Sequence, residues 1–272
     1  MNYKLACSLA FLFAMLAPSA QADYAMTVFG HPVEIVGRLN DQRLTVDGRV
    51  LVKDVIVTID QINVVAGTGV LIGGSSGGGN ACDVAPFVVS FPPGGQPKVD
   101  GPIDECGMGT ITFHPQSIEF VYSALPDLPG HRWIWTAAAG FKDAGEIAFG
   151  ANRKLGWDAL RHHDLSFPID LYENGEVGAA IKALTGTDDP AFTAGLRGPS
   201  DGEFVGDLYV GSGCVAHDCP SAGSFIIADI ANRKVYLAWK EDDRPFAVRP
   251  AVREWPGPFR LRLKEWTEKF AK

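Results

Sequence analysis

The sequence predicts an α+β fold: an N-terminal antiparallel β-sandwich or barrel, followed by a smaller domain that combines helices with an antiparallel sheet. The 272 residues include 31 glycines and 18 prolines, a content that favours strands and turns over a helical bundle. Short β-rich runs fill residues 23–150, and a clear helical pattern first appears after residue 174. A hydrophobic content of 46% provides a sizeable core and excludes a disordered tail.

Residues 1–22 have the pattern of a secretory signal peptide. Lys4 precedes an apolar run that continues to Ala17, and the small residues Ala20 and Ala22 end the segment. We expect cleavage after Ala22 and a periplasmic location in a bacterial envelope. The apolar run is too short for a membrane anchor, and no later stretch is long enough, so no stable membrane insertion is expected.

The acidic charge balance excludes one class of partner. The whole chain carries a net charge of -8, and removal of the signal peptide takes away only Lys4. Nothing in the chain would neutralise a phosphate backbone, so a nucleic-acid partner is not expected.

Residues 23–150 are predicted to form a β-rich domain whose role the sequence leaves open. Its strands are expected within residues 27–29, 33–36, 50–52, 55–59, 62–65, 87–89, 111–113, 118–122 and 133–135. Trp133 and Trp135 would share one face of a strand and fill the core, although a carbohydrate platform is an alternative. Solvation explains the acidic residues Asp100, Asp104 and Glu105.

A glycine-rich stretch at residues 73–80 is predicted to be a flexible loop. It contains the pattern Gly-x-Ser-x-Gly around Ser75, which in hydrolases places a nucleophile at the start of a helix. Three glycines follow Ser75 within four positions, and a helix would not tolerate them cheaply. We therefore expect no catalytic residue here and no enzymatic activity, with a Ser75 hydrolase as the weaker hypothesis.

Residues 151–272 mix helix and strand. Asn174 is expected to cap a helix that Gly186 ends, with one apolar face made of Val177, Ala180, Ile181 and Leu184. Strands are expected at residues 204–210, 225–230 and 234–239, the last two joined by a tight turn. Leu263, Trp266 and Phe270 have the spacing of a short closing helix.

The exported chain would keep four cysteines, which suggests disulfide bonds. Three pairings are possible, and we expect the two local ones, Cys82–Cys106 and Cys214–Cys219. In the chain-entropy model, the disulfide that closes the shorter loop stabilises the fold by about 2 kcal/mol, and the one that closes the longer loop stabilises it by about 3.5 kcal/mol.

The second pair would close a small loop directly after a predicted strand. The bridged loop consists of Cys214, Val215, Ala216, His217, Asp218 and Cys219, and it would hold His217 and Asp218 at its tip. A rigid, projecting loop loses little entropy on binding, and an exposed imidazole can donate hydrogen bonds to carboxylates.

This loop, followed by a hairpin, resembles that of the periplasmic inhibitors of vertebrate lysozyme. The usual motif of that family is Cys-Lys-Pro-His-Asp-Cys, and here Val215 and Ala216 replace the Lys-Pro pair. The similarity extends from the helix at Asn174 to Trp239, so the lysozyme-inhibitor-like domain is expected within residues 151–272.

The resemblance implies that the loop enters the cleft of lysozyme or another muramidase. His217 would meet the catalytic carboxylates, and Asp218 would orient His217 or bind basic groups at the rim. An acidic inhibitor would also be steered toward a basic enzyme. The resemblance implies no cofactor.

Two other interpretations of the loop compete with this one. The loop could be an ordinary surface turn around a structural disulfide. It could also bind a metal through Cys214, His217, Asp218 and Cys219, although four ligands within six residues can hardly surround one tetrahedral ion.

The sequence also contains a second polar cluster and leaves a rival function open. His162, His163 and Asp164 are expected at the surface rather than in a metal site. The rival function is a non-catalytic envelope protein that binds cell-wall glycan through its β-rich half.

Overall fold

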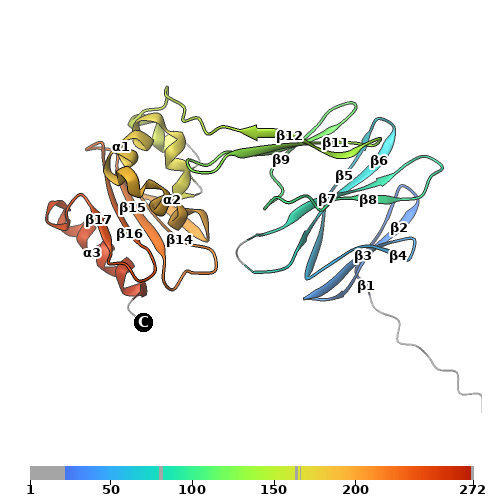
Figure 1. Cartoon of the computed structure of the whole chain (residues 1–272), viewed down its shortest axis with the longest axis horizontal. Helices are drawn as coiled ribbons and strands as arrows, with labels where there is room; N and C mark the ends of the chain where they lie inside the picture. Colours follow the sequence, from blue (N-terminus) through green and yellow to red (C-terminus); the bar gives the residue numbers. More distant parts are fainter. Residues whose placement is uncertain (1–21, 80–81, 163–164, 166, 271–272) are drawn as a thin grey trace, which may run out of the picture.

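The computed structural model describes residues 22–79, 82–162, 165 and 167–270. Residues 1–21 of the expected signal peptide lie outside the described part, and the first strand begins at Ala22. The described residues form four antiparallel sheets, three in the N-terminal region and one in the C-terminal region with the helices (Figure 1). The predicted fold class is therefore confirmed.

The three N-terminal sheets have four strands each, and in each sheet strands that are consecutive in the chain are neighbours. The first sheet contains β1 (Ala22–Val28), β2 (His31–Arg38), β3 (Asp41–Val46) and β4 (Arg49–Asp54). The second contains β5 (Ile56–Val65), β6 (Thr68–Ser76), β7 (Ala85–Phe91) and β8 (Lys98–Asp100). The third contains β9 (Thr110–Phe113), β10 (Ile118–Tyr122), β11 (Gly130–Thr136) and β12 (Gly140–Ile147).

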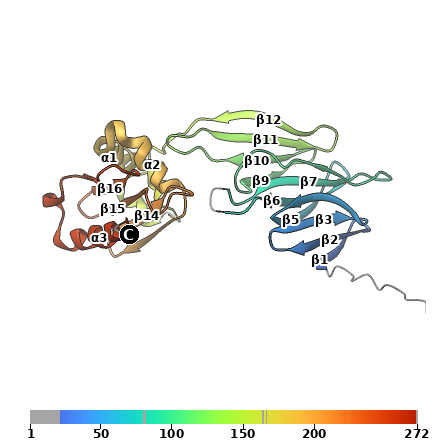
Figure 2. The same ribbon diagram turned by 60° about the horizontal axis from the view of Figure 1, so that its bottom comes forward.

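These sheets stack in three layers, with the β5–β8 sheet in the middle (Figure 2). Side chains alternate across a strand, so β6 has to be apolar on both faces. Leu71 points into the core shared with the β1–β4 sheet, and Val70 and Ile72 point into the core shared with the β9–β12 sheet. This central position explains why every residue of β6 is buried.

The expected glycine-rich loop is wrong for its first half. Gly73 and Ser75 belong to β6, where they pair with neighbouring strands on both sides. A side chain at position 73 would meet the ring of Phe87, because a β-carbon there would lie 2.5 Å from its Cζ atom. Glycine is required here by close packing in the middle layer and not by loop flexibility.

Both tryptophans of β11 pack into the third sheet's core, as predicted, and each donates a hydrogen bond to a carboxylate. Trp135 is fully buried and donates to Asp100 at 2.9 Å, while Trp133 is partly buried and donates to Glu105 at 2.9 Å. Solvation is therefore not the main role of these two carboxylates, because they satisfy indole N–H groups that the core would otherwise leave unpaired.

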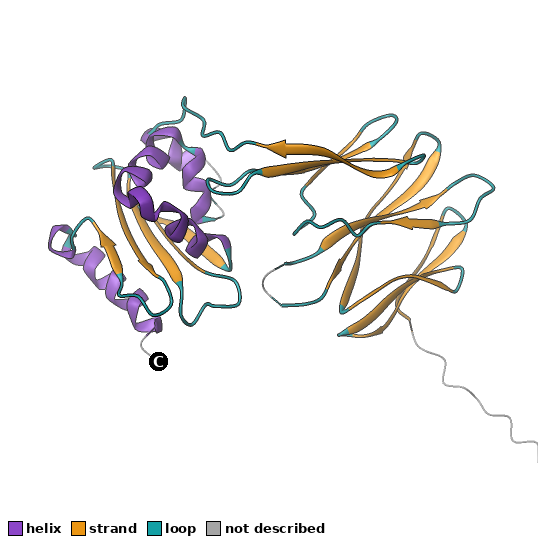
Figure 3. Cartoon of the chain, viewed as in Figure 1, coloured by secondary structure: helices purple, strands orange, loops and turns teal. Residues whose placement is uncertain are grey.

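The C-terminal region is a five-stranded antiparallel sheet with helices on both faces (Figure 3). Its order is β13 (Ser200–Val205), β14 (Leu208–Cys214), β15 (Gly223–Asp229), β16 (Lys234–Lys240) and β17 (Ala247–Arg249). Helices α1 (Gly175–Thr185) and α2 (Asp189–Arg197) pack on one face, and α3 (Gly257–Thr267) packs on the other. Short 3₁₀ turns occupy Trp157–His162, Pro168–Glu173, Gly186–Asp188, Val252–Glu254 and Glu268–Phe270.

The predicted signals for α1 and for the hairpin are confirmed. The Asn174 side chain accepts a hydrogen bond from the Val177 amide at 3.1 Å. Strands β15 and β16 form the hairpin, with Gly223 opposite Lys240 at one end and Asp229 opposite Lys234 at the turn. The single strand expected at residues 204–210 is wrong, because Gly206 takes a φ of +62° and turns the chain there. That turn separates β13 from β14.

Candidate functional site

The loop after β14 is closed at its base by a disulfide bond. Cys214 ends β14, and β15 begins at Gly223. Cys214 and Cys219 are bonded, with their α-carbons 4.8 Å apart, and Cys82 and Cys106 form the second bonded pair. Both cysteines of the loop are thus engaged with each other, which leaves no thiolate for a metal.

Backbone hydrogen bonds inside the loop fix its shape. The Asp218 amide donates to the Val215 carbonyl at 2.9 Å and closes a turn at the tip. The amides of Ser221 and Ala222 donate to the Asp218 carbonyl, each at 2.9 Å. His217 is exposed and takes a φ of +66°, which the third position of a type II turn requires. The loop therefore presents its imidazole at a fixed point.

Two glycines let the loop base lie directly on the end of α2. A β-carbon at Gly198 would lie 2.2 Å from the Cys214 carbonyl oxygen, and one at Gly213 would lie 2.8 Å from the Gly195 carbonyl oxygen. Only glycine allows these backbones to come so close. The end of α2 therefore packs directly against the backbone at the base of the loop.

The N-terminal region contributes to the surroundings of His217, which the sequence did not predict. A β-carbon at Gly79 would lie 3.3 Å from the His217 Cε1 atom, so the chain that follows β6 approaches the imidazole. The Cys82–Cys106 bond ties this segment to the loop that leads into β9. A partner that receives His217 must therefore also accommodate this segment.

A second contact joins the N-terminal region to α2, the helix whose end lies against the base of the loop. The connection between β10 and β11 reaches the C-terminal core, where Leu125 packs against the cluster under α1 and α2. Asp127 in the same connection forms an ion pair with Arg197, the last residue of α2, at 3.4 Å. Because Arg197 precedes Gly198, this ion pair braces the helix end on which Cys214 rests.

One histidine of the N-terminal region is held between two carboxylates. His131 on β11 lies between Glu105 and Asp143, bonded through Nδ1 to the first carboxylate and through Nε2 to the second. The hydrogen bond to Glu105, supported by the one to Asp143, raises the pKa of His131 above its usual value. Two carboxylates therefore favour the protonated imidazole.

The other candidates of the sequence are Ser75 and the cluster of His162, His163 and Asp164. Ser75 is buried in β6 at 3% exposure, and the strand ends at Ser76 with non-helical residues at 77–79, where a hydrolase would begin a helix. His162 is exposed as expected, whereas His163 and Asp164 fall outside the described residues. Within the described ranges no group of three or more His, Cys, Asp or Glu side chains could hold a metal ion.

Comparisons with known proteins divide the chain in the same way. Residues 29–148 match the family model described as the Y4bG N-terminal domain, and residues 176–269 match that of the Inhibitor of vertebrate lysozyme (Ivy). "Uncharacterized protein y4bG" of Sinorhizobium fredii (strain NBRC 101917 / NGR234) is 38% identical over 249 residues, which cover 92% of each chain. The chain belongs to the y4bG family. Its C-terminal half resembles the Ivy inhibitors, and the 214–219 loop lies inside the Ivy match.

Proposed function

We propose that this y4bG-family protein is a periplasmic inhibitor of lysozyme or a related muramidase. The observation that carries the proposal is a disulfide-closed turn, inside the Ivy match, that holds an exposed imidazole at its tip. The inhibitor inserts the 214–219 loop into the enzyme cleft and performs no catalysis of its own.

The proposed mechanism uses the chemistry of the target's active site. Lysozyme cleaves glycan with two carboxyl groups that flank the scissile bond. His217 donates hydrogen bonds to these groups, more strongly when the imidazole is protonated, and its presence excludes the substrate. The Asp218 backbone already holds the turn, so its carboxylate is available to basic groups at the cleft rim. The turn is preformed, which limits the entropy lost on binding.

The proposal includes a domain organisation. Residues 1–22 direct export and are removed, residues 23–150 form a β-rich domain, and residues 151–272 form the inhibitory domain. The two disulfides fit an oxidising compartment. No helix in the described part of the chain is long and apolar enough to cross a membrane. Asp127 of the β-rich domain forms an ion pair with Arg197, at the helix end that contacts the base of the loop. Gly79 of the same domain lies beside His217, so a partner can approach the imidazole only from the other sides.

The experiment is a turbidity assay in which a muramidase lyses cell walls in the presence of the purified mature protein. A panel that includes a vertebrate lysozyme and a bacterial muramidase identifies the target class. Slower lysis, with a stoichiometric complex on gel filtration, is the expected result. Asp218→Asn should weaken the complex more at low salt than at high salt, because the rim contact is electrostatic. Binding to purified peptidoglycan without any effect on the enzymes would instead support a glycan-binding protein.

A further inference from the structure

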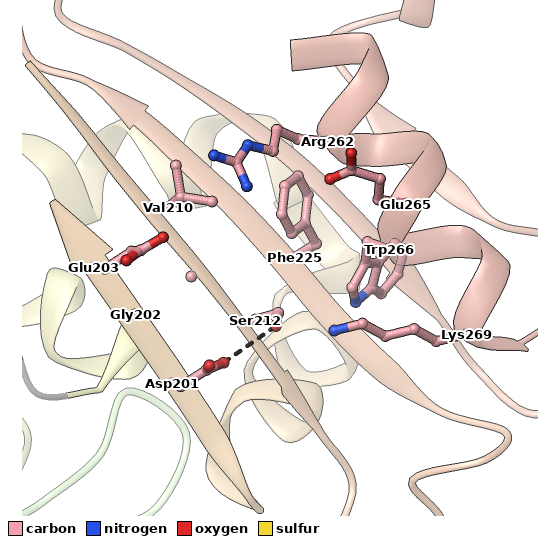
Figure 4. Close-up of a pocket in the computed structure, with 11 residues that line it drawn as sticks. Asp201, Gly202, Glu203, Val210, Ser212, Phe225, Arg262, Glu265, Trp266 and Lys269 are labelled. Atoms are coloured by element: carbon pink, nitrogen blue, oxygen red, sulfur yellow. Dashed lines mark hydrogen bonds between the residues drawn. The ribbon is translucent and has the colours of Figure 1, made fainter. Parts of the chain in front are cut away.

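A charged groove lies on the outer face of the C-terminal sheet, between α3 and the strands β13 and β14 (Figure 4). Its main hollow has a volume of about 440 Å³, within the range of small-ligand sites. An adjoining hollow of about 390 Å³ shares Asp201, Ser212, Trp266 and Lys269 with it. This second hollow reaches the Cys214–Cys219 disulfide.

The groove exists because α3 covers only part of the sheet. Phe259, Leu263 and Trp266 of α3 pack with Phe225 of β15 and Tyr236 of β16. Leu208 and Val210 of β14 are only partly buried against this cluster, and β13, the edge strand, contributes no residue to it. The outer surface of β13 and β14 therefore forms part of the floor and one wall of a hollow whose other wall is the helix.

The strand wall is acidic. Asp201 and Glu203 are two residues apart on β13, so both side chains point to the same face of the sheet. Both are exposed, and across the ladder they lie opposite Ser212 and Val210. The Ser212 hydroxyl donates to Asp201 at 3.4 Å.

The helix wall carries the cations. Arg262 and Lys269 are seven residues apart on α3 and the turn that follows it, a spacing that places both on one side. Both are exposed, and Glu265 lies between them on the same rim. In Figure 4 the Arg262 and Lys269 side chains extend from the helix toward the strands.

The charged side chains of the two walls are not in direct contact with each other. Among the described residues, Asp201, Glu203, Arg262, Glu265 and Lys269 form no ion pair with an N···O distance of 4.0 Å or less. Opposite charges therefore face each other across an open space with an apolar floor of Val210, Phe225 and Trp266. A ligand that carries only one charge would complement one wall and oppose the other.

We propose that this groove binds a short zwitterionic peptide. The peptide's ammonium group lies against Asp201 and Glu203, its terminal carboxylate lies against Arg262 and Lys269, and its side chains contact the apolar floor. Two sources share this chemistry: a stem peptide released from the cell wall with a free amino terminus, and an ordinary peptide of the same length. This binding is independent of the inhibitory loop, although the occupant would lie close to the base of that loop.

The test is calorimetric titration of the full mature chain with trialanine and its two singly charged derivatives. Trialanine should bind, and both the N-acetylated and the C-amidated forms should bind at least about tenfold more weakly, because each loses one charged contact. Equal affinity for the three peptides would overturn the proposal. A cell-wall stem tripeptide in a parallel titration distinguishes the two sources: tighter binding than trialanine indicates the cell wall, and comparable binding indicates peptides in general. Absence of binding by both peptides at millimolar concentration would also overturn the proposal.

Variants locate the site. Glu203→Gln and Lys269→Met should each weaken binding of the zwitterionic peptide about tenfold, because each removes one wall's charge. Arg260→Met is the matched control, since Arg260 is exposed on the same helix but does not line the groove. An equal loss in the control, or no loss in the two groove variants, would overturn the assignment. His217→Asn should leave peptide binding unchanged, which separates this site from the inhibitory function.

Discussion

Removal of the Cys214–Cys219 bond tests whether the loop is held mainly by its disulfide. The double substitution of Cys214→Ser and Cys219→Ser opens a ring whose ends are five positions apart in sequence. Loop-closure entropy for so short a ring is worth about 2 kcal/mol, so the free energy of unfolding of the C-terminal domain should fall by that amount. Hydrogen exchange in urea measures the loss separately for peptides of the two regions.

The second disulfide provides the matched control. Cys82 and Cys106 are 24 positions apart, so their replacement by serine should cost about 3.5 kcal/mol, and the loss should fall in the N-terminal region. In the loop variant, inhibition should weaken by at most about 30-fold, the equivalent of about 2 kcal/mol. An unchanged unfolding free energy would mean that the loop's own hydrogen bonds suffice. That result would refute the entropic argument.

The remaining predictions concern single residues. His131→Gln should remove a stabilising contribution that is complete below pH 6.5, the ordinary pKa, and is lost as pH rises through the raised folded value; unfolding curves between pH 5 and 9 measure it. Asn174→Ala should cost about 1 kcal/mol in chemical unfolding, because the α1 cap is lost, and an unchanged midpoint would contradict that role. Gly79→Ala should shift the NMR signal of the His217 ring, whereas Gly30→Ala, with a similar positive φ but no atom within 4 Å, should not.

Elements that depend on local sequence signals were predictable. The cap at Asn174 and the apolar spacing that follows it specify α1, because both act within one or two turns of the helix. The hairpin of β15 and β16 was predictable for the same reason, since its strands are adjacent in the chain. The disulfide pairings also follow from short separations along the sequence.

Features that depend on tertiary packing were not predictable. Gly73 resembles a loop residue in sequence, and only its contact with Phe87 in the middle layer explains its place in a strand. The turn at Gly206 is different, because Val205 pairs with Leu208 across Gly206 and Asp207, and a two-residue Gly-Asp connection is a local hairpin signal that the single-strand prediction missed. Helix α2 has a start signal in Asp189 and Pro190, but it spans only nine residues, and Phe192 and Leu196 are buried against the sheet.

The surroundings of the loop were hidden for the same reason. Gly79 and His217 are far apart in sequence, and Asp127 reaches Arg197 through a connection in the other half of the chain. No local pattern indicates either contact. The sequence could therefore suggest the loop and its imidazole but not the N-terminal segment beside it.

The most direct measurement is the inhibition constant of the His217→Asn variant against the muramidase that the mature protein binds. Asparagine tolerates the positive φ of this position, so the turn is kept while the imidazole is removed. The inhibition constant should rise about 30-fold or more, as for a central interface residue, while the His162→Ala control leaves it unchanged. Full inhibition by the His217 variant would contradict the proposed mechanism.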